Sequence, residues 1–459
     1  MEKFWNTIAA FFQESGIVGF FINGGWLNLI MIVVACVLLF LAIKKEFEPY
    51  LLLPIAFGML LVNLPFVAQE LFRGGTEYTA TSLVDAINIT SEQSEYIFTT
   101  LGKDTANTAS IWELVKQDSF LTNAPASLNF TDAVIDEIEH LYRYDYTGIF
   151  GYLYYGVKLG IYPCLIFLCI GATTDFGPLI ANKKTMLLGA AAQIGIFMTF
   201  VGAIIIGKNC LGWTKFDARI ASAIGIIGGA DGPTAILVTT KLAPDYLPSI
   251  AIVAYSYMAL VPVIQPPIIR LLTTKKERAI KMETPREVSK TERILFPIVV
   301  TCITVVLVRS AAPLVGCLML GNLIKESGVV PKITQTLANS LMYIVTILLG
   351  ICVGCTADAQ TFLTIDTILI FVLGIIAFSV ATAAGVLGGK IMCWATKGKV
   401  NPMIGAAGVS AVPMAARVVH KEGLREDPTN FLLMHAMGPN VAGVIGSAVA
   451  AGVLLLLFL

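Results

Sequence analysis

Charged residues are scarce in this chain: only 14% of its 459 residues are Asp, Glu, Lys or Arg. Because soluble globular domains carry about 25% charged residues, this composition excludes an ordinary soluble domain. Basic and acidic residues balance at 31 each, so the chain lacks the basic excess typical of a nucleic-acid partner. Histidine is rarer still, with three residues. Neither a histidine cluster nor a second cysteine pair completes the Cys-x-x-Cys run at 352–355 as a zinc site.

Long apolar runs are what the chain has in place of charge. Hydrophobic residues make up 56% of the sequence, and the mean hydropathy is +0.79. A helix of about 20 apolar residues crosses a bilayer. On this basis the sequence predicts an all-α polytopic membrane protein with about ten transmembrane helices. They are expected at 26–43, 50–68, 149–172, 185–207, 248–271, 294–309, 311–325, 338–356, 366–389 and 430–458.

Two further segments, 221–240 and 401–420, are too rich in glycine, proline and small residues to be simple spans. We expect re-entrant or broken helices there. The Cys-to-Asp run at 169–175 is matched at 352–358, and in each half an apolar span and then a broken segment follow. Each half has five crossings, an odd number, so the second half should enter the membrane upside down. The sequence therefore predicts an inverted repeat.

The segments between the spans set the orientation. The N-terminal stretch is expected to lie on the membrane surface as an amphipathic segment. Residues 69–148 carry 13 acidic and 4 basic residues and predict a small, acidic, helical insert outside the cytoplasm. Basic residues concentrate in the loop at 274–293, which marks the cytoplasmic side and links the two repeats. The predicted divisions are thus 1–25, 26–68, 69–148, 149–273, 274–293 and 294–459.

One carboxylate stands inside the first broken segment. Asp231 lies within Gly-Gly-Ala-Asp-Gly-Pro-Thr at 228–234, between two apolar stretches. Because a charge at membrane depth is costly, we interpret it as an ion or substrate site. The alternative is a kinked helix whose aspartate reaches toward the membrane surface. Asn440 and Ser447, seven residues apart, project from one face of the last span, and with Asp231 they offer the hard oxygen ligands that an alkali cation prefers.

The second broken segment carries four further candidates, Asn401, Gly405, Ser410 and Arg417. Arg417 is always charged and suits a carboxylate. An arginine that anchors a helix end at the cytoplasmic surface is an equally good explanation. Tyr257, on the span after the first break, has a hydroxyl to offer, but packing is the commoner role for a single tyrosine in a membrane.

Two long motifs carry a family resemblance. Gly-Gly-Ala-Asp-Gly-Pro-Thr-Ala-Ile at 228–236 and Met-Gly-Pro-Asn-Val-Ala-Gly-Val-Ile-Gly-Ser at 437–447 closely resemble the β subunits of biotin-dependent, sodium-translocating decarboxylases. That family serves pumps that decarboxylate oxaloacetate, methylmalonyl-CoA, glutaconyl-CoA or malonate. The resemblance covers residues 26–68 and 149–459 and leaves the acidic insert aside.

The resemblance implies a subunit, in the plasma membrane of a prokaryote, that decarboxylates carboxybiotin. The reaction consumes a proton, and its free energy moves Na+ outward. Biotin would arrive on a partner carrier subunit, alongside a carboxyltransferase subunit and a small membrane anchor subunit, in an oligomeric assembly. By the same resemblance, the catalytic residues are Asp231, Tyr257 and Arg417, carboxybiotin is bound by Asn401, Gly405 and Arg417, and Na+ is bound by Asp231, Ser410, Asn440 and Ser447.

Asp231 suits this task because burial disfavours a bare carboxylate, whereas a bound cation relieves the cost. It is therefore expected to alternate between Na+ and H+. A secondary transporter, such as a sodium–carboxylate symporter or a sodium–proton antiporter, would share the inverted repeat and the intramembrane aspartate. A purely structural anchor is disfavoured, since it gains nothing from buried polar groups in lipid.

Residues 279–284 resemble the lysine motif at which biotin is attached. A biotin carrier presents that lysine on a β domain of ~80 residues. The loop from Thr274 to Glu292 is far too short to contain such a domain. Biotin is therefore expected on another polypeptide.

Overall fold

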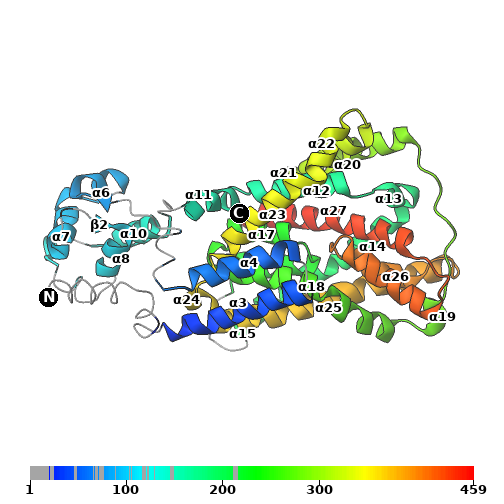
Figure 1. The fold of residues 1–459 in the computed structure, drawn as a ribbon, viewed down its shortest axis with the longest axis horizontal. Helices are drawn as coiled ribbons and strands as arrows, with labels where there is room; N and C mark the ends of the chain where they lie inside the picture. Colours follow the sequence, from blue (N-terminus) through cyan, green and yellow to red (C-terminus); the bar gives the residue numbers. More distant parts are fainter. Residues whose placement is uncertain are drawn as a thin grey trace, which may run out of the picture. The chain divides into compact units, whose positions relative to one another are not determined.

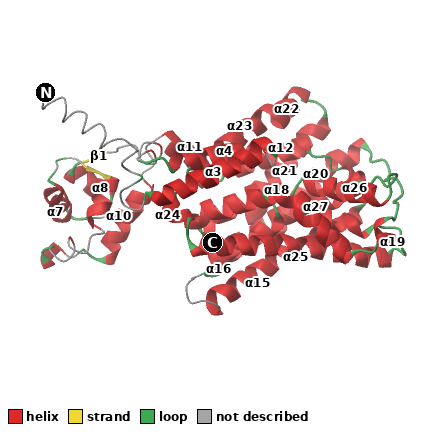
Figure 2. Cartoon of the chain, turned by 60° about the horizontal axis from the view of Figure 1, so that its bottom comes forward, coloured by secondary structure: helices red, strands yellow, loops and turns green. Residues whose placement is uncertain are grey.

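The computed structural model describes most of the chain. The described residues are 20, 25–45, 49–65, 67, 71, 77–87, 89–102, 104, 106–115, 120, 124–128, 130–144, 149–209 and 216–459. The predicted surface segment at 1–25 therefore lies outside the described residues, apart from Phe20 and Gly25. The described part of the chain is almost entirely helical, with one pair of short antiparallel strands (Figure 2). This confirms the predicted all-α class.

The chain divides into two units, one of residues 1–25 and 61–155 and one of residues 26–60 and 156–459. The smaller unit has a hydrophobic core of its own, which includes Leu83, Ile97 and Ile111. Its location outside the cytoplasm stays a prediction. Its elements are β1 (Glu77–Tyr78), α6 (Ala80–Ala86), α7 (Ser91–Leu101), β2 (Ala106–Asn107), α8 (Thr108–Val115), η1 (Ala126–Leu128) and α10 (Asp132–Tyr144).

The rest of the chain forms a helical bundle that is interrupted in several places (Figure 1). Two helices, α4 (Pro49–Val62) and α11 (Ile149–Lys158), include residues of both units. The first half otherwise comprises α3 (Trp26–Lys44), α12 (Ile161–Thr173), α13 (Gly177–Ala181), η2 (Lys183–Thr185), α14 (Met186–Ala192), α15 (Ile194–Asn209), α16 (Ala218–Gly225), η3 (Ile226–Gly229), α17 (Gly232–Leu242), η4 (Pro244–Tyr246) and α18 (Leu247–Leu272). Its second half comprises α19 (Lys275–Arg278), α20 (Lys290–Leu307), η5 (Arg309–Ala311), α21 (Ala312–Ser327), α22 (Pro331–Thr336), η6 (Leu337–Leu341), α23 (Met342–Gly354), α24 (Ala359–Phe362), α25 (Ile365–Ala395), η7 (Pro402–Gly408), α26 (Met414–Glu426) and α27 (Leu433–Phe458).

Helix occupies each of the ten ranges in which a span is expected. Among the described residues, five helices are long and apolar enough to cross a membrane, or up to seven if each of two bent pairs counts as one span. The others fail for local reasons: α4 and α21 are 14 and 16 residues long, and α20 carries three charges in its first turn. The count of ten therefore stays a prediction.

The outer faces of the helices are apolar. In α3, Val33, Phe40 and Ile43 are exposed, whereas Met31 and Ala35 are buried. An apolar surface of this kind marks contact with a membrane or a partner. Together with the spans, it indicates that the larger unit lies in lipid.

Both segments that the sequence predicts to be broken are interrupted helices. In the first, α16 and η3 end at Ala230, which has a positive φ of 54°, and α17 starts only after Asp231. In the second, the 3₁₀ turn η7 ends at Gly408, and α26 starts only at Met414. Each interruption leaves backbone groups outside the helical hydrogen-bond ladder, and these are the groups that line the candidate site.

Glycine lets several helices approach within backbone contact. A Cβ atom at Gly171 of α12 would come within 3.0 Å of the Leu318 carbonyl oxygen of α21, and one at Gly321 would meet the Leu168 carbonyl oxygen in the same way. Helices in membranes pack closely through small residues of this kind. The α12–α21 contact is therefore a fixed seam of the larger unit.

A pair of alanine variants tests this seam. We expect Gly171→Ala to lower the unfolding free energy by about 1–3 kcal/mol, because the added methyl group forces two backbones apart. Gly316→Ala, on the partner helix α21, is the matched control because a Cβ there meets nothing within 4 Å. Thermal melting of the detergent-solubilised chain measures both, and equal melting temperatures for the two variants would contradict the close approach.

Candidate functional site

Asp231 caps the helix that follows the first interruption. Its carboxylate Oδ1 accepts a hydrogen bond from the Thr234 backbone N–H at 3.3 Å, at the N-terminus of α17. A helix N-terminus stabilises a negative charge. The Asp231 side chain is nonetheless only 5% exposed, and no basic side chain in the described part of the chain acts on it. Buried charges are normally paired or bind metals, so this carboxylate lacks a counter-charge.

Ser447 of α27 supplies the second hydrogen bond to that carboxylate. Its Oγ donates to Asp231 Oδ2 at 2.7 Å, and it also lies 3.0 Å from the Val444 carbonyl oxygen. The contact spans 216 residues of sequence. It joins the first interrupted segment to the last helix, as the motif pair in the sequence predicts.

The second interruption meets the first directly. The Ser410 backbone N–H donates to the Gly229 carbonyl oxygen at 2.9 Å. On the other side, the Asn440 side-chain amide donates to the carbonyl oxygens of Ala407 and Val409 at 3.0 and 2.8 Å. Both polar side chains keep an oxygen without a hydrogen-bond partner, Ser410 Oγ and Asn440 Oδ1. A native structure rarely leaves buried oxygens unsatisfied, so these two are open to a ligand or an ordered water.

Gln193 is a member of this cluster that the sequence reasoning missed. Its amide nitrogen donates to the carbonyl oxygens of Gly189 and Gly443 at 3.2 and 3.3 Å, whereas its Oε1 is buried and has no partner. A Cβ at Gly229 would lie 3.6 Å from that Oε1 and 3.3 Å from Ser447 Cβ. The signal in the sequence was a single amide inside the apolar run at 185–207.

The cluster offers oxygen atoms only. The carboxylate of Asp231 contacts the hydroxyl of Ser447, and the segments packed around them carry three further buried oxygens without a protein partner, on Ser410, Asn440 and Gln193. Oxygen sets of this kind suit hard cations, whereas thiolate and imidazole select softer metals. No group of three or more His, Cys, Asp or Glu residues gathers anywhere in the described ranges. The chemistry therefore fits an alkali cation.

Tyr257 and Gly405 lie in other packing environments. The Tyr257 hydroxyl donates to the Phe371 carbonyl oxygen of α25, and its ring packs against Gly374. Tyr255, two residues earlier on the same helix, has its ring against Gly232, the residue after Asp231. Gly405 is in backbone contact with Gly385, so it allows η7 to lie directly on α25.

Both the nitrogen and the oxygen of the Asn401 side-chain amide form hydrogen bonds. Its nitrogen donates to the carbonyl oxygens of Arg278 and Ile280, each at 2.9 Å, and its Oδ1 accepts from the Met403 backbone N–H at 3.0 Å. Asn430 donates to the same two carbonyl oxygens. The linker at 274–293 is therefore fastened to the body of the protein by two buried amides.

Lys281 and Arg417 differ in their contacts. Lys281, in the biotin-like motif, contacts Asp427 Oδ2 at 3.0 Å and Thr429 Oγ1 at 2.6 Å. Hydrogen bonds from Thr429, together with Lys281, lower the pKa of Asp427 to about 2. Arg417, in the first turn of α26, is exposed and forms no ion pair with another described residue. Its charge is therefore available to an anion from solution.

The match to known proteins runs over almost the whole chain. The family model described as the Na+-transporting oxaloacetate decarboxylase beta subunit matches residues 27–458. The β subunit of methylmalonyl-CoA decarboxylase from Propionigenium modestum is 50% identical over 98% of this chain and 99% of its own length. The oxaloacetate decarboxylase β chain 2 of Salmonella typhi is 50% identical over 93% and 94%, and the glutaconyl-CoA decarboxylase β subunit of Acidaminococcus fermentans is 45% identical over 99% and 98%.

These matches confirm the resemblance and correct its extent. The family model runs through residues 69–148 without being confined to the flanking ranges, and the Propionigenium subunit is matched over nearly the same length. The insert is therefore shared with a family member and is not an addition peculiar to this chain. The matches favour the decarboxylase over a symporter or antiporter, and the chain belongs to the family of Na+-transporting oxaloacetate decarboxylase β subunits, which are membrane-bound components of sodium-translocating decarboxylases.

Proposed function

We propose that this subunit decarboxylates carboxybiotin and couples the reaction to the outward movement of Na+ through the cluster around Asp231. One observation carries the proposal: a buried carboxylate without a counter-charge stands where two interrupted helices meet, among oxygens that lack partners. Carboxybiotin would arrive on a carrier subunit that works with a carboxyltransferase and a small membrane anchor subunit. Lys281 is engaged with Asp427, which supports a biotin held on another chain.

The acid that is decarboxylated is selected by another subunit. The similar relatives carry the names of methylmalonyl-CoA, oxaloacetate and glutaconyl-CoA decarboxylases, yet each is 45–50% identical to this chain over most of its length. A subunit that recognised the acid itself would need a different pocket for each of these molecules. We therefore assign that choice to the carboxyltransferase, and to this chain the step that all these enzymes share.

Sodium is proposed to lie between Asp231, Ser410, Asn440 and Ser447. The Ser447 hydroxyl now donates to the carboxylate. A hydroxyl can rotate and offer a lone pair, so the same group can serve the empty and the loaded state. Gln193 Oε1 is the fifth proposed oxygen. Its amide nitrogen is held by two carbonyl oxygens, which aims the free oxygen at the cluster.

The coupling follows from the cost of burial. In the reaction, the bond between the biotin ring nitrogen and its carboxylate breaks, CO2 leaves, and the electron pair stays on the nitrogen, which takes up one proton. Asp231 cannot remain charged and unpaired in its pocket without a large penalty. It therefore exchanges Na+ for H+ instead of emptying, and the proton that replaces Na+ becomes available for the ring nitrogen.

We also propose that the two halves form the inverted repeat with ten crossings, with the insert at 69–148 outside the cytoplasm. Equivalent contacts support this. Gly171 of α12 meets the Leu318 carbonyl of α21, and its counterpart Gly354 of α23 meets the Ile55 carbonyl of α4. The reverse contacts are equivalent as well. Gly321 of α21 meets the Leu168 carbonyl of α12, and Gly58 of α4 meets the Ile351 carbonyl of α23. The offset from Leu168 to Ile351 is the same 183 residues that separates Gly171 from Gly354.

The remaining predicted residues are proposed to act at the cytoplasmic end. Arg417 would attract the carboxylate of carboxybiotin, because its guanidinium is exposed and unpaired within the described structure. Asn401 would act by fixing the linker, and Gly405 by letting η7 lie against α25. Tyr257 would act by fastening α18 to α25 through Phe371.

Replacement of the buried acid tests the proposal. In the complete decarboxylase complex reconstituted in vesicles, we expect Asp231→Asn to lower sodium-dependent decarboxylation by roughly 10²-fold or more, and to abolish 22Na+ transport. Asp245→Asn is the control, since that carboxylate lies in the same half of the chain but is exposed. In the unaltered complex, protons should compete with Na+ for the Asp231 carboxylate. The KM for Na+ should therefore rise as the pH falls. Sodium transport by Asp231→Asn at the normal rate would refute the assignment.

Two glutamine variants separate a ligand from a structural amide. Gln193 and Gln265 are both buried, both donate to a backbone carbonyl, and both keep an unpartnered Oε1. We expect Gln193→Leu to raise the KM for Na+ about tenfold, the effect of one lost polar contact, with little change in kcat at saturating Na+. Gln265→Leu should leave that KM unchanged. Steady-state rates over a sodium titration measure both, and a similar shift in the two variants would assign Gln193 a packing role only.

A further inference from the structure

Two thiols face each other across the seam between α12 and α21, which lie side by side in Figure 1. Cys164 of α12 and Cys317 of α21 are free cysteines, and their side chains are hydrogen-bonded to each other. Helix α12 belongs to the first half of the larger unit and α21 to the second. One new bond between these two sulfur atoms would therefore join the two halves.

The register of the seam supports this pairing. Leu168 of α12 meets Gly321 of α21. Farther along both helices, the Lys325 side-chain nitrogen donates to the Thr174 carbonyl oxygen at 2.9 Å, so α12 and α21 run in the same direction. Leu168 and Gly321 are 153 residues apart in the sequence, and the two cysteines have the same separation. Because residues four apart lie on one face of a helix, each thiol precedes a backbone contact by one turn.

The spacing of the two backbones suits a disulfide. A disulfide forms when the two Cα atoms lie about 4.4–6.8 Å apart and the Cβ atoms face each other. At Gly171 and Gly321 the two helices are so close that an added Cβ would overlap a carbonyl oxygen of the other helix. One turn from such a contact, facing side chains lie within reach of a single S–S bond. The thiols can therefore be joined without moving the helices apart or together.

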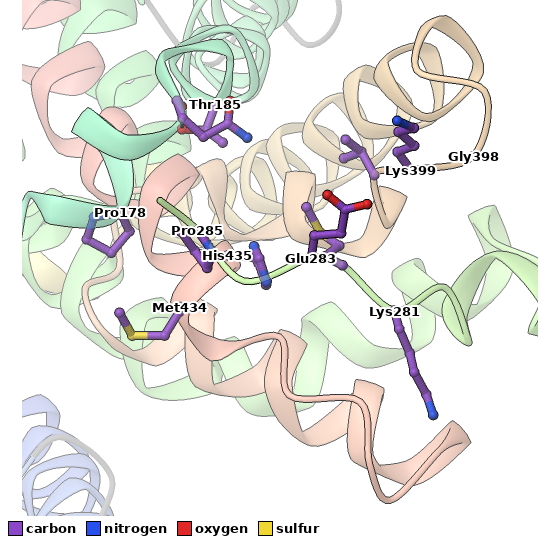
Figure 3. A pocket seen from close by; sticks show the side chains of 12 residues that line it. Pro178, Thr185, Lys281, Glu283, Pro285, Gly398, Lys399, Met434 and His435 are labelled. Carbon is purple, nitrogen blue, oxygen red and sulfur yellow. Dashed lines mark hydrogen bonds between the residues drawn. The ribbon is translucent and has the colours of Figure 1, made fainter. Parts of the chain in front are cut away.

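The lipid-facing surface gives access to the pair. Each thiol is half-buried, and an exposed apolar side chain lies three residues away on the same helix, Ile161 near Cys164 and Leu320 near Cys317. A cavity of about 360 Å³ elsewhere in the larger unit is no route to the thiols, because none of its described lining residues is a cysteine (Figure 3). An oxidant that reaches the pair therefore comes from the bilayer.

The Cys-x-x-Cys run at 352–355 holds a second close pair of thiols, near the end of α23. Cys352 and Cys355 are only 0% and 1% exposed, respectively. The oxidation of a thiol depends on its exposure. The pair between α12 and α21 should therefore react first.

We propose that Cys164 and Cys317 form an oxidation site, at which a lipid-soluble organic hydroperoxide creates a disulfide that ties the two halves together and leaves the pump active. One thiol attacks the outer peroxide oxygen, the O–O bond breaks, and an alcohol leaves with the thiol proton, which yields a sulfenic acid. The other thiol attacks that sulfur, the S–S bond forms, and water leaves. The two thiols lose two electrons, and the peroxide gains them.

The disulfide acts on the unfolded chain more than on the native one. It would enclose the first break and the linker at 274–293 in one loop, and a disulfide stabilises mainly by restricting the unfolded state. The native seam changes little, because its backbones are already in contact at Gly171 and Gly321. Transport should therefore continue in the oxidised chain. This role does not depend on the reaction that drives the pump.

Thiol counting on the purified full chain tests the site. The chain has nine cysteines, and we expect cumene hydroperoxide to lower the number of maleimide-reactive thiols, counted after denaturation, from nine to seven. Dithiothreitol should restore the original number. Cys164→Ser and Cys317→Ser each start with one thiol fewer and should lose none. Peptide mapping by mass spectrometry should find residues 164 and 317 in one disulfide-linked peptide.

Cys355→Ser is the matched control, because it breaks the second pair of thiols and leaves the first intact. It should still lose two thiols on oxidation. If Cys355→Ser instead protects the chain, or if the unaltered chain keeps all of its thiols, the proposal is wrong.

Melting and transport measurements test the consequence of the bond. Oxidation should raise the melting temperature of the unaltered chain by roughly 5 °C and leave that of Cys164→Ser unchanged. In the complete complex in vesicles, 22Na+ transport should continue at the same rate after oxidation. Arrest of transport in the unaltered complex but not in Cys164→Ser would show that the seam moves during the cycle, and would overturn the proposal. An unchanged melting temperature in a chain that has formed the disulfide would do the same.

Discussion

The hydrogen bond from Ser447 to Asp231 is the contact on which the site depends, because it is made to a carboxylate that has no counter-charge of its own. The donors to Asp231 are a serine hydroxyl and the backbone of Thr234, both neutral. A neutral shell orients a carboxylate but leaves most of its burial cost in place. The pocket is therefore stable only when a cation or a proton completes it. This instability is what a pump requires, since a carboxylate that was satisfied by an arginine would bind neither.

The two interrupted helices expose backbone groups at the site. A continuous helix hides its carbonyl and amide groups in its own ladder, whereas the breaks at Ala230 and at 409–413 expose them to each other. The link from Ser410 to Gly229 then fastens one break to the other. Around them, backbone contacts at glycine, such as Gly171 on Leu318, leave little room for the helices to shift independently. A rigid frame thus surrounds a pocket whose occupancy is not fixed.

The sequence indicates the polar groups of the site more readily than their contacts. Asp231 and Ser410 in the breaks, and Asn440 and Ser447 on α27, stand out because polar residues at membrane depth are costly. The contacts of Tyr257 do not follow from the sequence, because residues two apart on a helix face nearly opposite directions and only the packed structure places Tyr255 against Gly232. Gln193 escaped notice because a single amide in an apolar run resembles an ordinary span. Likewise, sequence alone gave no reason to expect that Asn401 fastens the linker, since its partners are carbonyl oxygens about 120 residues away.

The two halves contribute different side chains to the proposed cation site. Aligning the two breaks places Ala411 opposite Asp231 and Ser410 opposite Ala230, so the first half supplies the acid and the second half supplies a neutral hydroxyl. Two acids at these positions would lie close together, and like charges at short range would force them to share a proton. A shared proton would be held tightly and would not exchange readily for Na+. In the proposed mechanism, a single acid lets Na+ and H+ compete for the same two carboxylate oxygens. In the proposed inverted repeat, one acid is thus better suited to exchange than two acids at equivalent positions would be.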